Sequence, residues 1–68
     1  MALIIYRHEM PTERAPYETQ CQVKHKDDID VYVQFNKEEI CPRWEFIGTF
    51  STKLPQSTID RFIFNRFH

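Results

Sequence analysis

The stretch 19–35 constrains the fold most, because apolar and polar residues alternate through both of its halves. This period of two is typical of a strand that buries one face. A three-residue connection between the halves would set His25 opposite Ile29 and Val23 opposite Val31. The apolar side chains of both strands would then share one face, whereas a connection of even length would mix the faces. The sequence therefore predicts a β-hairpin with a three-residue turn.

Further elements flank this hairpin. Residues 2–7 and 43–50 each predict a strand, and Gly48 leaves room for a bulky neighbour or marks a bulge. Residues 57–67 carry apolar side chains at helical spacing, although a fifth strand is the alternative there. One helical turn is expected over 37–40. The predicted fold is α+β, a small antiparallel sheet of three to four strands with one C-terminal helix packed on its aromatic face. Phe46, Phe50 and Phe62 are among the residues expected in the core between them.

Size and composition limit the functions open to the chain. With 68 residues it forms one domain with a thin core. Its single glycine excludes a glycine-rich phosphate loop. No apolar run approaches the roughly 20 residues of a membrane span, and the apolar N-terminal run is too short for a signal peptide. We expect a cytoplasmic protein without a membrane partner, in which Cys21 and Cys41 are reduced thiols.

The sequence offers no specific catalytic or metal motif. Cys21 and His25 are four residues apart on a predicted strand, which separates them by about 13 Å, too far to share one metal ion. The loop that holds His8, Glu9, Glu13 and Arg14 contains residue types that could cleave a phosphodiester. Polar loops carry such residues routinely, however. We therefore expect a protein that is not an enzyme and that binds no metal or cofactor.

Nucleic-acid binding has weak support in the sequence. The net charge is −1, with nine Lys and Arg against ten Asp and Glu, whereas phosphate binding needs clustered cations. Tyr32 lies beside Lys24 in the predicted hairpin, and Arg61 and Arg66 form a small cationic group. A nucleic-acid-directed protein, either a single-strand binder or a minimal ribonuclease, is kept as one alternative.

Aromatic and amide side chains without a place in the predicted core favour a protein partner. Exposed apolar patches on small domains mark interfaces, and aromatic residues are enriched there. We predict a small non-enzymatic module that inhibits or adapts a larger protein, by analogy with phage and mobile-element accessory proteins that act on host machinery. A homodimer or structural subunit is the other alternative. The predicted contact residues are Gln20, Gln22, Lys24, Tyr32, Gln34, Ile47, Arg61 and Phe64.

Overall fold

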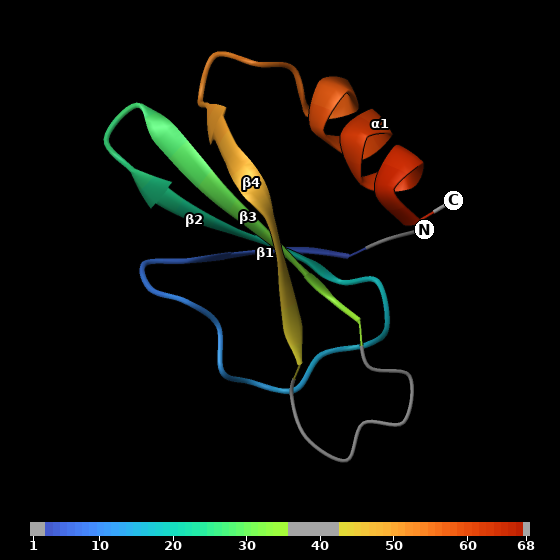
Figure 1. Ribbon diagram of the computed structural model, residues 1–68. Helices are drawn as coiled ribbons and strands as arrows, with labels where there is room; N and C mark the ends of the chain where they lie inside the picture. Colours follow the sequence, from blue (N-terminus) through green and yellow to red (C-terminus); the bar gives the residue numbers. More distant parts are fainter. Residues whose placement is uncertain (1–2, 36–42, 68) are drawn as a thin grey trace.

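A computed structural model describes residues 3–35 and 43–67 of the chain. The elements in chain order are β1 (Ile4–Arg7), β2 (Gln20–His25), β3 (Asp28–Gln34), β4 (Trp44–Ser51) and α1 (Gln56–Phe67). This order confirms the predicted β-β-β-β-α layout, with the helix on one side of the sheet (Figure 1). The helical turn predicted over 37–40 and the side chains of Cys41 and His68 lie outside the described residues. No helix in the described part is long and apolar enough to cross a membrane.

The sheet is mixed, with strand order β1-β2-β3-β4. Strands β2, β3 and β4 pair antiparallel, but β1 pairs parallel to β2, with Ile5 opposite Cys21. The prediction of a wholly antiparallel sheet is therefore wrong for this pair. The long connection over residues 8–19 carries the chain back to the end of the sheet where β1 starts, and a parallel pair needs such a crossover.

The hairpin has a two-residue turn, so its predicted register is wrong by one residue. His25 lies opposite Asp28, and Val31 lies opposite Gln22. Lys26 in the turn has a φ of 54°, the left-handed backbone that two-residue hairpin turns require and that glycine or asparagine usually supplies. Neither residue type occurs in this turn, so no local residue pattern indicates a two-residue turn here.

The register differs because both faces of the sheet are covered. Val31 and Val33 face α1, while the register places Cys21 and Val23 on the opposite face, where both are buried. The segment 8–19 crosses that opposite face (Figure 1). The apolar residues of β3 are therefore buried by α1, and those of β2 are buried by the segment 8–19. The two sets do not need to lie on the same face of the sheet.

A bulge in β4 divides the predicted aromatic face. Val31 pairs with Gly48 and Tyr32 with Phe46, which leaves Ile47 as the extra residue. Ile47 is buried in the core beneath α1, together with Ile59 of the helix. The bulge places Phe50 on the helix side of the sheet and Phe46 on the other side.

The helix predicted for residues 57–67 is confirmed, and the alternative strand is excluded. Ile59 is almost completely buried, and Ile63 and Phe67 pack beside it at helical spacing. Phe62, which the same spacing placed in the core, is 47% exposed at the margin of the helix. The helix therefore packs through a narrower stripe than the sequence predicts.

Candidate functional site

Four of the predicted contact residues are buried and cannot form an outer surface. Gln20, Gln22 and Gln34 are almost fully enclosed, and so is Ile47. The one-residue difference in register turns Gln20 and Gln22 toward α1. There they hydrogen-bond with Gln56 and Asp60 of the helix. The prediction that these glutamines belong to an exposed contact surface is therefore wrong.

The other four predicted residues do not gather into one patch. Lys24, Arg61 and Phe64 are exposed, with Lys24 on the face of β2 that is turned toward the helix. Tyr32 is half-buried on the opposite face of the sheet. The structure therefore leaves no continuous surface made from the predicted set, and the candidate site must be sought elsewhere.

The outer edge of β4 is the longest stretch of unpaired backbone at the margin of the sheet. The N–H of Thr52 donates to the carbonyl of Asp27 (2.9 Å), and that of Phe35 donates to the carbonyl of Arg43 (3.1 Å). These bonds fix the phase of the β3–β4 ladder, because bonded and non-bonded pairs alternate along an antiparallel ladder. The pairs at both ends of β4 are non-bonded, so their backbone groups point away from β3.

With this phase, the registers on either side of the bulge turn Trp44, Phe46 and Thr49 outward, together with Ser51. The carbonyl of Ser51 accepts the N–H of Leu54 (3.1 Å). The remaining outward N–H and C=O groups have no hydrogen-bond partner within the described residues. Such a row of free donors and acceptors is a template for another extended chain.

Aromatic side chains flank this open edge on both faces of the sheet. On the helix side, the rings of Phe50 and Phe62 meet edge to face at 5.3 Å. On the other side, the ring of Phe46 lies 5.3 Å from that of Tyr32, and Phe46 is 51% exposed. Sequence reasoning placed Phe46, Phe50 and Phe62 in the core. Gly48, which lies beside the bulge, is the sequence feature that could have indicated that Phe46 and Phe50 lie on different faces of the sheet.

The opposite edge of the sheet, formed by β1, is protected. β1 has only four residues. The N–H of Gln20 donates to the carbonyl of Leu3 (2.8 Å). Because alternate residues of a strand bond to a parallel neighbour, the backbone groups of Tyr6 point away from β2. The guanidinium of Arg7 donates to this outward carbonyl of Tyr6 (2.7 Å). A short strand with a charged side chain across its free carbonyl is a common protection against strand addition.

In the loop that contains His8, Glu9, Glu13 and Arg14, the Glu13 carboxylate is bound by Arg7 and is not free to act as a base. Arg7 binds the Glu13 carboxylate through both Nε and Nη2, and this hydrogen bonding lowers the pKa of Glu13. A carboxylate in such a pair is a weak proton acceptor.

No cluster of three or more metal-ligating side chains occurs among the described residues. Burial raises the pKa of the Cys21 thiol, which makes it a poor nucleophile.

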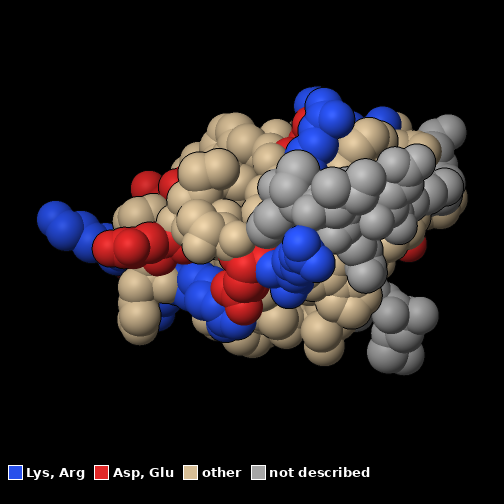
Figure 2. Space-filling view, turned by 90° about the horizontal axis from the view of Figure 1, so that it is seen from below, with Lys and Arg blue, Asp and Glu red and all other residues tan. Residues whose placement is uncertain are grey.

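The charges do not form a phosphate-binding surface on the face seen in Figure 2, where basic and acidic side chains lie interspersed. Arg66, one of the two arginines in the predicted cationic group, is paired with Glu45 of β4 (2.9 Å). A paired arginine contributes less to phosphate binding than a free one.

Among known proteins, no family model, no curated protein and no solved structure matches this chain.

Proposed function

We propose that this chain is a small non-enzymatic binding module that inhibits or adapts a larger protein. We further propose that an extended segment of the partner adds to the sheet as a strand beside β4. The observation that supports this proposal most is the outward backbone of Trp44, Phe46 and Thr49. Strand addition gains affinity from main-chain hydrogen bonds and specificity from alternate side chains.

The aromatic side chains on the two faces beside the β4 edge would contact the side chains of the partner strand. A strand beside β4 would direct its side chains alternately toward Phe62 on the helix side and Phe46 on the other side. A partner segment with apolar residues on both faces therefore fits this edge best. The bulge at Ile47 twists β4, so the partner pairs with the segments on either side of the bulge rather than in one uninterrupted ladder.

Substitution of Thr49 tests the proposal with a matched control. Thr49→Pro removes an outward N–H that no strand of this sheet uses, while proline is tolerated at such edge positions. Thr49→Val removes the hydroxyl that donates to Asp30 (2.7 Å) but keeps the N–H. Tagged wild-type, Thr49→Pro and Thr49→Val proteins would be used for affinity capture from native lysate with and without nuclease, after circular dichroism has confirmed their folding.

We expect one stoichiometric protein that survives nuclease, remains with Thr49→Val and is lost with Thr49→Pro. Phe46→Asp, at an exposed position, should also weaken its capture. Retention of that protein by both Thr49→Pro and Phe46→Asp would exclude the β4 edge as the interface. Capture that disappears with nuclease would instead favour the nucleic-acid-directed alternative, and capture of the untagged chain alone would favour the homo-oligomer.

A further inference from the structure

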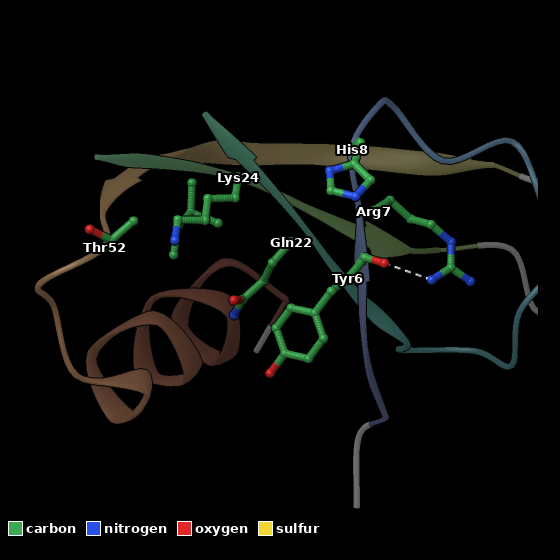
Figure 3. A pocket seen from close by; sticks show the side chains of 7 residues that line it. Tyr6, Arg7, His8, Gln22, Lys24 and Thr52 are labelled. Carbon is green, nitrogen blue, oxygen red and sulfur yellow. Dashed lines mark hydrogen bonds between the residues drawn. The ribbon is translucent and has the colours of Figure 1, made fainter. Parts of the chain in front are cut away.

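A second candidate site lies on the helix side of the sheet, away from the β4 edge. Near the end of β1 and the turn that follows β4, a cavity of about 330 Å³ opens to the surface (Figure 3). This volume is at the small end of the range for ligand pockets. The cavity is lined by Tyr6, Arg7, His8, Gln22, Lys24, Ile29 and Thr52. This described lining contains basic, aromatic and amide side chains and no carboxylate.

The orientation of the Gln22 amide is set by the charge of Asp60. The Asp60 carboxylate accepts hydrogen bonds from Gln56 Nε2 (2.9 Å) and from Gln20 Nε2 (3.3 Å). An ionised carboxylate can only accept hydrogen bonds. Both glutamines must therefore turn their NH₂ groups toward Asp60 and present their oxygens to other donors.

Those oxygens in turn fix Gln22. Its Nε2 donates to Gln20 Oε1 (2.7 Å) and to Gln56 Oε1 (2.8 Å), which uses both of its protons. The Gln22 side chain is almost fully buried, yet it lines the cavity, and Oε1 has no donor among the described residues. The network therefore presents a rigid hydrogen-bond acceptor to the cavity.

Two basic side chains of the cavity have no partner within the described residues. Neither Lys24 nor His8 forms an ion pair or a hydrogen bond there. The third, Arg7, is occupied by Glu13, and its guanidinium points away from Gln22 and Lys24 (Figure 3). Lys24 and His8 are therefore available to an anion, and a phosphate is the anion that lysine commonly binds in proteins.

Apolar surface completes the cavity. Tyr6 is 66% exposed, and Ile29 contributes an aliphatic side chain on the same face of the sheet. An exposed aromatic ring is a platform on which a planar base stacks. A ligand that uses all these groups has a flat ring, a hydrogen-bond donor and an anionic group within a small volume.

We propose that this cavity binds a nucleoside monophosphate. Its base stacks on Tyr6, its phosphate contacts Lys24 and His8, and a hydroxyl or amino group donates to Gln22 Oε1. The same chemistry is offered by a free mononucleotide and by the 5′-phosphorylated end of a single strand. This site is separate from the β4 edge, so it does not depend on the partner proposed above.

An NMR titration of the ¹⁵N-labelled chain tests the site. AMP, adenosine, inorganic phosphate and a 5′-phosphorylated oligodeoxyadenylate are added in separate arms. We expect AMP to shift the amide signals of Tyr6, His8 and Lys24, together with the Gln22 side-chain NH₂. Adenosine and phosphate should each bind at least about tenfold more weakly, because each lacks one of the contacts. Tighter binding of the oligonucleotide than of AMP would assign the site to a strand end, and the reverse order would assign it to the free nucleotide.

Exposed residues provide variants that leave the core intact. Tyr6→Ser and Lys24→Gln should each weaken AMP by about tenfold or more, whereas Lys53→Gln, at an exposed lysine outside the cavity, should not. The proposal is overturned if AMP shifts none of the four cavity signals, if both cavity variants bind AMP as wild type does, or if phosphate alone binds as tightly as AMP.

Discussion

Removal of the Asp60 side chain should destabilise the domain more than its exposed position suggests. Asp60 accepts the only hydrogen bond that Gln20 Nε2 donates within the described residues, and Gln20 is almost fully buried. Asp60→Ala leaves this buried donor unsatisfied, at a cost of about 1–3 kcal/mol. The bond is long, 3.3 Å, so we take about 2 kcal/mol, including the exposed bond to Gln56.

This loss is large relative to the stability of so small a domain. A single core of this size supplies only about 3–5 kcal/mol, and each kcal/mol shifts the Tm of such a domain by about 4–8 °C. We therefore expect Asp60→Ala to lower the Tm by roughly 10 °C. Asp60→Asn keeps an acceptor oxygen and should lose less than half as much. Thermal unfolding followed by far-ultraviolet circular dichroism measures the Tm of both variants, and urea unfolding followed by Trp44 fluorescence measures their free energies of unfolding.

A double-mutant cycle locates the cause of the effect. Gln20→Ala removes the donor, so Asp60→Ala should cost about 1 kcal/mol less in that background than in the wild type. Asp27→Ala, at an exposed position in the hairpin turn, is the control and should stay within about 0.5 kcal/mol of wild type. A cost below about 0.5 kcal/mol for Asp60→Ala, or no coupling to Gln20, would refute the network as described.

Two further predictions concern titratable groups on the other face of the sheet. Hydrogen bonding from Arg7 lowers the pKa of Glu13 below its ordinary value, so the pair stabilises the fold above that ordinary pKa, and the gain is lost as the pH falls through the lowered pKa. Glu13→Gln should therefore lower the Tm at pH 7 and leave it equal to wild type at about pH 2, and equal losses at both pH values would contradict this. Cys21 is buried and its thiol pKa is raised, so in a Cys41→Ser variant it should react with a thiol reagent at least about a hundredfold more slowly in buffer than in urea. Similar rates in both solvents would show that Cys21 is accessible in the native protein.

The elements of this fold could be predicted from sequence because each is encoded by its own residues. The spacing of Ile59, Ile63 and Phe67 predicts a helix without reference to the rest of the chain, and the alternation in the hairpin predicts two strands. What could not be predicted is which face each strand turns to the helix. That depends on the segment 8–19, which covers the second face, and a period of two contains no information about such a cover.

The residues of the two candidate sites could not be predicted from the sequence for a related reason, because long-range contacts determine where they lie. Sequence reasoning places phenylalanines in the core, but the bulge at Ile47 leaves Phe46 on the face away from the helix. It also places glutamines in solvent, because a buried amide without partners is costly. Gln22 is buried at little cost because its amide NH₂ donates hydrogen bonds to Gln20 and to Gln56, which lies 34 residues later in the sequence. A contact over that distance cannot be read from local periodicity.

The same amide network explains why the chain adopts a two-residue turn that its sequence does not favour. Lys26 has a positive φ, which costs about 1 kcal/mol or more for a residue other than glycine. A slip of β2 by one residue would give a three-residue turn, which usually contains a left-handed residue as well, and would turn Gln20 and Gln22 away from Gln56 and Asp60. It would thereby break the three hydrogen bonds that join these two strand amides to the helix side chains. Because several buried amides would lose their partners together, polar contacts rather than apolar alternation determine the register of this hairpin.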